Sequence, residues 1–281
     1  MNISGFCHKS THQRLLSNGI KGGLDCFSLL FLLFAAFFAH PGLASTSEVG
    51  ATPGSFRVSE SGAAIYTIPI VVPPGTAGMA PNLSLTYNSQ SGNGILGMGW
   101  SLEGLSGIYR CPASIAQDGF KGGINFDGND RYCLDGQRLV VVSGTYGADG
   151  TEYRTETESY ARIISYGTAG SGPAWFKVWT KPGQIAEYGN SDDSRIEAQG
   201  RADVRQWSVN KISDTKGNYW TAIYNEDNTN GEAYVSRVDY TGNAAAELTP
   251  YNSIHFHYES RSDDTPHFIA GSKVQLTKRL V

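Results

Sequence analysis

WFKVWTKPGQIAEY, residues 175–188, carries the plainest structural pattern in the chain. Apolar and polar residues alternate in WFKVW and again in QIAEY, as they do in a strand with one buried and one wet face. Between them, Lys181-Pro182-Gly183 supplies turn chemistry, because proline presets φ and glycine tolerates positive φ. The stretch therefore predicts an antiparallel β-hairpin.

The same pattern continues on both sides of this hairpin. Towards the C-terminus, residues 206–212 and 218–224 flank a turn at 214–217, and residues 234–240 and 253–260 flank a turn that begins at 241–243. Further strands are expected at residues 63–72, 83–87, 139–142, 152–166 and 273–281. We therefore predict an all-β fold in which successive antiparallel hairpins form a curved or two-layer sheet.

The first 44 residues have the order of a signal peptide. Lys9, Arg14 and Lys21 precede the apolar run 27–39 (FSLLFLLFAAFFA), and Gly42-Leu43-Ala44 offers a small-residue cleavage site. The run has 13 residues, whereas a membrane-spanning helix needs about 20. We expect residues 1–44 to be a signal peptide, residues 45–53 a flexible mature N-terminus, and the protein to be secreted. An uncut single-pass anchor and a periplasmic destination are the alternatives.

Charge narrows the choice of partners. The formal net charge is −4, and removal of residues 1–44, with three basic residues and one acidic residue, brings it near −6. An acidic surface repels phosphate, so nucleic acid and anionic lipid are poor partners. The mature sequence has no further apolar run long enough to span a membrane, so we expect no stable membrane span after cleavage.

Two cysteines, Cys111 and Cys133, remain in the mature chain. An even pair in an oxidising compartment predicts a disulfide. In the chain-entropy model it would stabilise the fold by about 3 kcal/mol. The alternative is two reduced, buried thiols.

A long stretch of the sequence, followed by several shorter motifs in a fixed order, resembles a known family. Residues 54–111 read GSFRVSESGAAIYTIPIVVPPGTAGMAPNLSLTYNSQSGNGILGMGWSLEGLSGIYRC, and residues 130–139 read DRYCLDGQRL. YTGN at 240–243, HYESR at 257–261 and KRL at 278–280 continue the pattern. Together they resemble the SpvB-type domain, which opens the Salmonella virulence plasmid B protein, the B components of insecticidal toxin complexes and related YD-repeat (Rhs-type) proteins.

The resemblance implies a fold and a role. Such a domain is the opening part of a β-sheet shell, or cocoon, in which YD-repeat strands enclose a toxic cargo. We therefore expect residues 54–281 to form one SpvB-type β domain. The chain ends within a predicted strand, so we expect this domain to be truncated at its C-terminal end. Its partners would be a downstream YD-repeat shell or toxin-complex proteins, and no catalytic residue carries over from the family to this region.

Acidic and histidine clusters raise the possibility of bound metal. The glycine-rich stretch between the cysteines is rich in carboxylate and amide side chains, namely Asp118, Asp127, Asn129, Asp130 and Asp135. They could hold Ca²⁺, but they lack the EF-hand order, and turn formation explains them as well. His255 and His257 share a strand face and could bind a metal with His267, Asp263 or Asp264. We expect no required cofactor.

Three further motifs point to other functions. Glu156-Thr157-Glu158 copies the E-x-E pair of actin-type ADP-ribosyltransferases, and Ser45-Thr46-Ser47 copies their S-T-S. Residues 92–97 match G-x-G-x-x-G, but a glycine-rich stretch follows where a dinucleotide site needs a helix. Five tryptophans could form a sugar-binding face, although core packing is their usual role: Trp100, Trp175, Trp179, Trp207 and Trp220.

These observations favour a non-enzymatic, secreted structural module of a virulence or toxin-delivery shell. A standalone module that binds carbohydrate or a host surface is the alternative. An ADP-ribosyltransferase toxin is the third hypothesis, and it is the one with the weakest sequence support.

Overall fold

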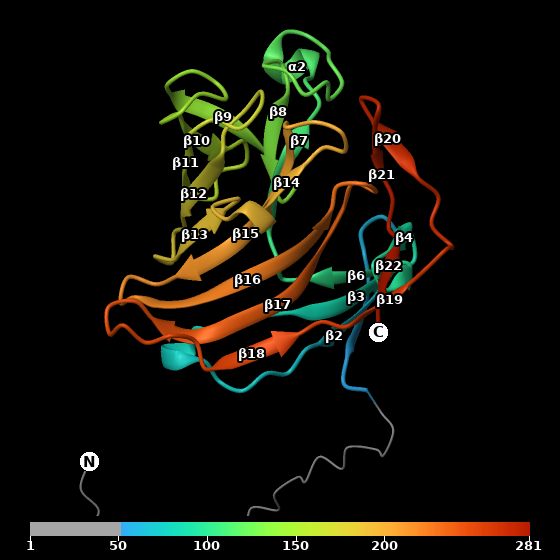
Figure 1. Cartoon of the computed structure of the whole chain (residues 1–281), viewed down its shortest axis with the longest axis vertical. Coiled ribbons are helices and arrows are strands. Elements are labelled where there is room, and N and C mark those ends of the chain that lie inside the picture. The colour runs from blue at the N-terminus through green and yellow to red at the C-terminus, as the bar shows by residue number, and fades with distance from the viewer. Residues whose placement is uncertain (1–51) are drawn as a thin grey trace, which may run out of the picture. The chain divides into compact units, whose positions relative to one another are not determined.

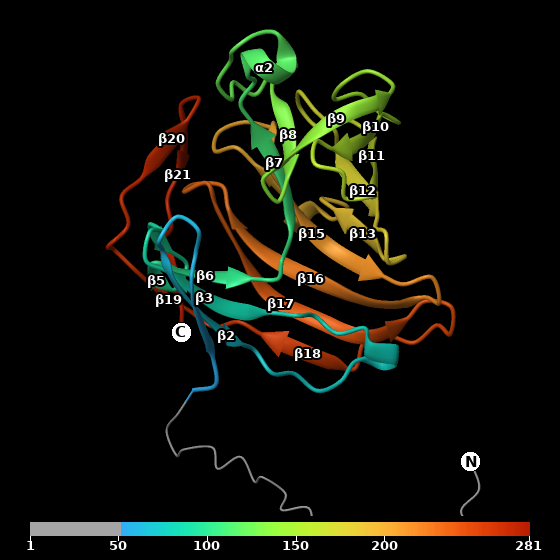
Figure 2. The ribbon, with the colours of Figure 1, turned by 180° about the vertical axis from the view of Figure 1, so that it is seen from behind.

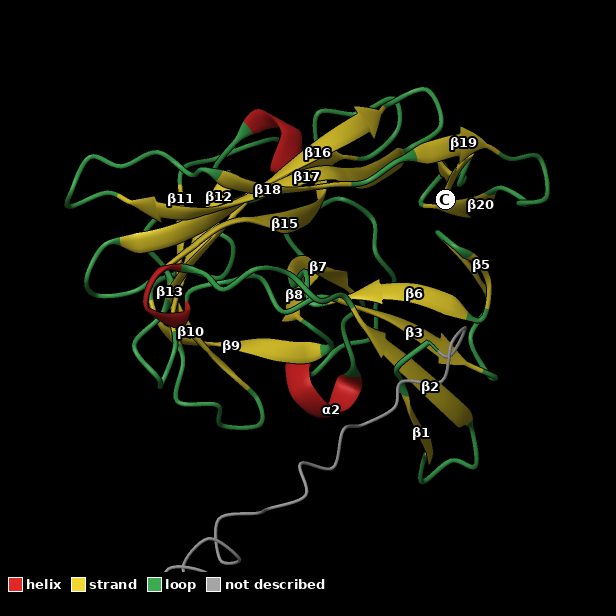
Figure 3. Ribbon diagram, turned by 90° about the horizontal axis from the view of Figure 1, so that it is seen from below, coloured by secondary structure: helices red, strands yellow, loops and turns green. Residues whose placement is uncertain are grey.

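The computed structural model describes residues 52–281, so the predicted signal peptide and residues 45–51 of the expected flexible stretch lie outside the described residues. The predicted all-β architecture of antiparallel strands is confirmed (Figures 1 and 3). Helical structure is limited, in the part of the chain described, to one-turn pieces at η1 (Thr76–Gly78), α2 (Ile115–Asp118) and η2 (Asp192–Ser194). None of the described helices is long and apolar enough to cross a membrane.

The N-terminal part forms a four-stranded sheet. Its strands, in spatial order, are β1 (Ser55–Val58), β2 (Ala64–Pro69), β3 (Ser84–Asn88) and β6 (Trp100–Glu103). A small hairpin of β4 (Asn93–Gly94) and β5 (Gly97–Met98) separates β3 from β6. Figure 3 shows β1 at the outer side of this sheet.

The middle of the chain closes into a ring of strands. The ring contains β7 (Gly107–Cys111), β8 (Arg131–Leu134), β9 (Gln137–Ser143), β10 (Glu152–Thr155), β11 (Arg162–Tyr166), β12 (Trp175–Trp179), β13 (Ile185–Tyr188) and β15 (Val204–Ser213). Residues 206–208 of β15 pair with β7, and residues 209–213 pair with β13. Each strand of the ring therefore has a partner on both edges.

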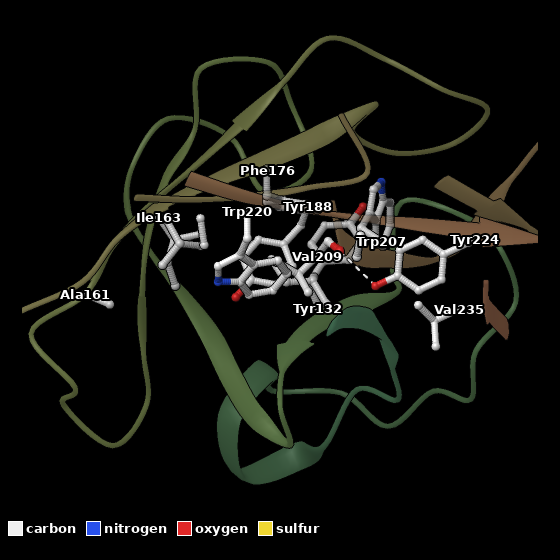
Figure 4. Packing of buried hydrophobic residues seen from close by; sticks show 14 of the residues in the cluster. Tyr132, Ala161, Ile163, Phe176, Tyr188, Trp207, Val209, Trp220, Tyr224 and Val235 are labelled. Carbon is white, nitrogen blue, oxygen red and sulfur yellow. Dashed lines mark hydrogen bonds between the residues drawn. The ribbon is translucent and has the colours of Figure 1, made fainter. Parts of the chain in front are cut away.

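Strand alternation fills the interior of this ring. In β12, Phe176 and Val178 are buried, while Trp175, Lys177 and Trp179 are only partly covered. The buried rings meet edge to face, with the Phe176 and Trp207 centroids 5.1 Å apart at 87° (Figure 4). The indole Nε1 of Trp207 donates to the Pro173 carbonyl at 3.0 Å, so this buried donor is satisfied.

A long sheet continues from the ring through β15. It adds β16 (Asn218–Asp227), β17 (Glu232–Asn243) and β18 (Asn252–His255), while the short β14 (Arg195–Glu197) also pairs with β15. Figure 2 shows the ring and this sheet joined at β15. The β15–β16 hairpin turns at residues 214–217 as predicted. The turn expected to begin at residues 241–243 lies further along the chain, because β17 continues through Asn243 and residues 244–247 form the turn before β18.

Three expected strands are each divided. Residues 253–260 are divided between β18 and a separate short strand at 258–260. Residues 152–166 form β10 and β11 with a turn between them, where Tyr160 takes a φ of 58°. Residues 273–281, expected as one strand, lie in β21 (Ser272–Val274) and β22 (Lys278–Leu280). β21 pairs with β20 (His267–Ile269) and β22 with β19 (Tyr258–Ser260), so the last strand has a partner within the chain.

Candidate functional site

The edge strand β1 is the candidate functional site. Among the described strands it pairs with β2 alone, and its four residues are all exposed. The Ser59 amide donates to the Ala63 carbonyl at 2.9 Å. Since hydrogen-bonded and non-bonded pairs alternate along an antiparallel ladder, the backbone groups of Phe56 and Val58 point away from β2. Such an edge is a template for a further strand.

An aromatic row crosses the sheet and ends at this edge. Phe56 lies opposite Tyr66, Tyr66 opposite Tyr87, and Tyr87 opposite Trp100. The Tyr87 and Trp100 ring centroids are 5.5 Å apart. Phe56 is 66% exposed and Val58 is 63% exposed. Since aromatic cross-strand pairs stabilise sheets by about 0.2–1 kcal/mol each, an added strand with an apolar side chain opposite Phe56 would extend the row.

Local glycines bring Trp100 into this row. A Cβ on Gly94 would lie 2.1 Å from the Trp100 carbonyl oxygen, so the β4–β5 hairpin can fold against the start of β6 only with glycine there. Gly99 has a φ of +80°, and a Cβ on it would lie 2.6 Å from the Tyr87 ring. The G-x-G-x-x-G pattern therefore serves a tight bend, and strand β6 follows it rather than a helix.

Polar contacts attach the C-terminal strands to the N-terminal sheet. Arg261, whose side chain is 1% exposed, donates at 2.6 Å both to the Gly94 carbonyl and to Asn93 Oδ1. The buried Glu232 accepts from the backbone amides of Thr277 and Lys278 at 2.9 and 3.0 Å. The Arg261 contacts hold the β4–β5 hairpin against the C-terminal segment, and the Glu232 contacts hold residues 277–278 against β17.

The ring behind this site is held by a buried ion pair. Arg110 and Asp130 meet at 2.9 Å, with side chains 1% and 0% exposed. Arg110 Nε also donates to the Val204 carbonyl at 2.7 Å, and Asp130 accepts from the Asn125 and Phe126 amides at 2.8 Å. Each charge is therefore compensated by several partners, as burial requires.

Two buried tyrosines remain protonated, and therefore neutral, in the folded molecule. Burial raises the pKa of Tyr188 and of Tyr224 above the usual range. Tyr224 donates to the Val209 carbonyl at 2.8 Å (Figure 4), and the Tyr188 hydroxyl lies 3.0 Å from Ser106 Oγ. They act as neutral hydrogen-bonding groups: Tyr224 links β16 to β15, and Tyr188 links β13 to the residue that precedes β7.

A carboxyl pair lies where β14 meets the long sheet. Burial, and then the negative charge of Glu197, raise the pKa of Glu226 to about 7. Glu226 Oε1 also accepts from the Glu197 backbone amide at 3.1 Å. Arg205 contributes an opposing positive charge and donates to the Gly231 carbonyl at 3.0 Å.

Cys111 and Cys133 are joined as a disulfide between β7 and β8, with their Cα atoms 6.0 Å apart. That separation lies within the range in which disulfides form. β7 and β8 are neighbours in the ring, and the disulfide joins them covalently at the end of β7, where the segment 112–130 between the two strands begins.

The acidic residues suggested as calcium ligands face separate partners. Asp118 bonds Arg131 at 2.7 Å and also Arg138. Asp130 binds Arg110, and Asp135 accepts from Ser106 at 2.5 Å. His255, His257 and His267 are exposed. Across residues 52–281, no group of three or more His, Cys, Asp or Glu side chains is placed to hold a metal ion.

The other candidate motifs are placed as follows. Glu156 accepts from Gln117 Nε2 and Glu158 from the Tyr160 amide, both at 2.5 Å, while residues 45–47 lie outside the described part. Trp207 and Trp220 are buried in the core. Trp175 and Trp179 lie on the outer face of β12. The aromatic row was not predicted from the sequence, because it depends on the register of four strands. The signal that could have indicated it is the presence of aromatic residues in adjacent predicted strands.

Comparisons with known proteins identify a family and solved structures that are similar to this chain. The family model described as SpvB, Salmonella virulence plasmid 65kDa B protein, matches residues 58–261. The structure of the N-terminal domain of the effector SpvB from Salmonella typhimurium strain LT2 has a TM-score of 0.59 and 22% identity, over 76% of this chain and 85% of that one. No curated protein sequence matched the chain.

Larger proteins contain the same fold. TcdB2-TccC3 gives a TM-score of 0.65 at 20% identity over 82% of this chain. The Photorhabdus luminescens Tc holotoxin pore gives 0.62 at 18% identity, also over 82%. The chain spans 14% and 13% of these two chains. Because the SpvB family model covers most of its length, this chain belongs to the SpvB family.

Proposed function

We propose that this chain is a non-enzymatic, exported structural module of a YD-repeat toxin-delivery shell. Its role is to offer the β1 edge to a further strand of that shell. The observation that carries the proposal is the aromatic row, which ends on the exposed Phe56 at an edge without a second partner among the described strands. Membership of the SpvB family supports the setting in a virulence protein.

The likeness to toxin-complex structures supports the choice of partner. The fold recurs in TcdB2-TccC3 and in a Tc holotoxin pore, where it occupies a small share of a much longer chain. A module of this size can join a larger sheet by backbone pairing, because main-chain hydrogen bonds along an edge supply affinity and alternate side chains supply specificity.

The polar side chains that resemble a transferase motif already serve local contacts. Glu156 accepts from Gln117, and Glu158 accepts from the Tyr160 amide just beyond the end of β10. Both glutamates are exposed on the loop between β10 and β11. These contacts favour a structural use of the E-x-E pair.

The test measures how well variants of the β1 edge assemble into a shell. The locus is sequenced beyond codon 281, and the YD-repeat protein encoded there, in this reading frame or a neighbouring one, is expressed with the chain. Phe56→Lys with Val58→Lys should reduce the yield of assembled particle about tenfold, as measured by light scattering. The matched control is Val142→Lys, since Val142 is a 57% exposed apolar residue in the ring.

Equal assembly by the edge variant and the control would contradict the role of β1. A locus without YD-repeat sequence would contradict the proposed shell itself.

A further inference from the structure

The outer face of β11, β12 and β13 carries aromatic side chains where a water-facing sheet normally carries polar ones. Ile163, Phe176, Val178 and Ala186 point into the ring and are buried. The alternate positions in β11 and β12 place Tyr166, Trp175 and Trp179 on the opposite, outer side, where each is partly exposed. These three residues are called the aromatic strip below.

Neighbouring side chains hold the strip in place. The rings of Tyr166 and Trp175 are stacked, with centroids 4.3 Å apart and an interplanar angle of 16°. The Trp179 ring lies 5.3 Å from the Arg162 guanidinium and 5.5 Å from Lys177 Nζ. Because side chains four residues apart in a strand share a face, the two tryptophans lie about 13 Å apart along it.

The charges around the strip pair with one another. Arg162 and Arg154 both bond Glu152 at 2.9 Å, and Lys177 lies 3.8 Å from Glu187. Positive and negative groups therefore alternate across the face, and the chain as a whole carries a net charge of −4. Such a face does not attract a strongly charged partner, but its paired charged groups can exchange hydrogen bonds with hydroxyls.

From this geometry we propose that the aromatic strip is a binding site for a neutral oligosaccharide. The apolar C–H faces of successive sugar rings would stack on Trp175 and Trp179. Their hydroxyls would bond Arg162, Lys177 and Glu187, which stand between and beside the two indoles. The separation of the tryptophans suits several linked sugars rather than a monosaccharide. The inference does not depend on the proposed shell function, since the strip is on the ring and not at the β1 edge.

The test uses the indole N–H signals of the full chain in ¹⁵N-correlated NMR spectra. Cellohexaose, chitohexaose and maltohexaose are added separately, up to millimolar concentration, with glucose and a heparin hexasaccharide as further probes. At least one neutral hexaose should shift the Trp175 and Trp179 signals. The Trp207 signal is an internal reference, because its N–H donates to Pro173 inside the core.

Variants complete the test. Trp175→Ala and Trp179→Ala should each weaken binding of that hexaose by about tenfold. Phe268→Ala is the matched control, because Phe268 is an aromatic residue 65% exposed on β20, and it should bind as the wild type does. The milder Trp175→Phe should retain most of the affinity, which separates loss of stacking from loss of folding. The inference is overturned if no neutral hexaose shifts the two signals, if heparin binds in preference, or if the alanine variants bind normally.

Discussion

The ring and the N-terminal sheet are both antiparallel, but they differ in how completely they are paired. Every ring strand has partners on both edges, and its interior holds a buried ion pair and edge-to-face aromatic contacts. In the N-terminal sheet, β1 has one partner among the described strands and leaves Phe56 and Val58 exposed. The ring satisfies its own hydrogen bonds, whereas the edge of the sheet can be satisfied by another chain segment. Stability should therefore reside in the ring and assembly at the edge.

The largest effect is expected from the buried ion pair of the ring. Asp130→Asn keeps the side-chain shape but leaves the Arg110 charge unpaired in the core, which should lower the free energy of unfolding by about 3–5 kcal/mol. Urea unfolding measures the loss. The control is Asp192→Asn, because Asp192 pairs with Arg195 at the surface with its side chain 101% exposed, and it should cost less than about 1 kcal/mol. Equal losses in the two variants would contradict a central role for the buried pair.

The disulfide should have the next largest effect. Cys111→Ser with Cys133→Ser should lower the free energy of unfolding by about 3 kcal/mol in the chain-entropy model. Reductant should shift the urea midpoint of the wild type towards that of the double variant, and it should leave the double variant unchanged. If the urea midpoint of the wild type does not change when reductant is added, the two thiols are not joined in solution.

A pH effect is expected where β14 meets the long sheet. The carboxyl of Glu226 has a pKa of about 7 in the folded chain against an ordinary value of 4.5. Between these values the unfolded chain has released this proton and the folded chain has kept it, so the free energy of unfolding should fall as pH rises through the window. Melting curves from pH 4 to 8 check it. Glu226→Gln should flatten this part of the profile, and Glu60→Gln, at an exposed position, should not.

The smallest effect on stability is expected at the edge. Phe56→Lys with Val58→Lys replaces two exposed side chains, and surface changes of this kind usually alter the free energy of unfolding by no more than about 0.5 kcal/mol each. The same pair should strongly impair shell assembly. A large loss of stability, seen in urea unfolding of the chain alone, would show that β1 is already packed and not available to another strand.

The hairpins could be predicted from the sequence because each depends on residues that are close together in the chain. The alternation in 175–188 and the Pro-Gly turn give β12 and β13 directly. Residues 152–166 kept an alternating pattern through a turn at Tyr160 that has neither glycine nor proline, so one strand was expected where there are two. The disulfide pair was predicted from the even number of cysteines and from the expected export of the chain.

Ring closure and the aromatic row could not be predicted from local sequence patterns. The ring closes because one strand, β15, pairs with β7 through residues 206–208 and with β13 through residues 209–213, although β7 and β13 are separated by about 75 residues. The row from Phe56 to Trp100 exists only in one register of three strand pairs, and a slip of one residue would place these side chains on the other face. Family resemblance predicted the architecture, while the contacts needed the structure.

The most direct test of this division between β1 and the ring is hydrogen exchange, measured in the chain alone and in the presence of the YD-repeat partner proposed above. In the chain alone, the amides of Phe56 and Val58 should exchange fast while those of buried ring strands such as β12 stay protected. In the assembled shell, the β1 amides should become protected and the ring should change little. Fast exchange of β1 in the assembled shell, or slow exchange in the chain alone, would contradict the account.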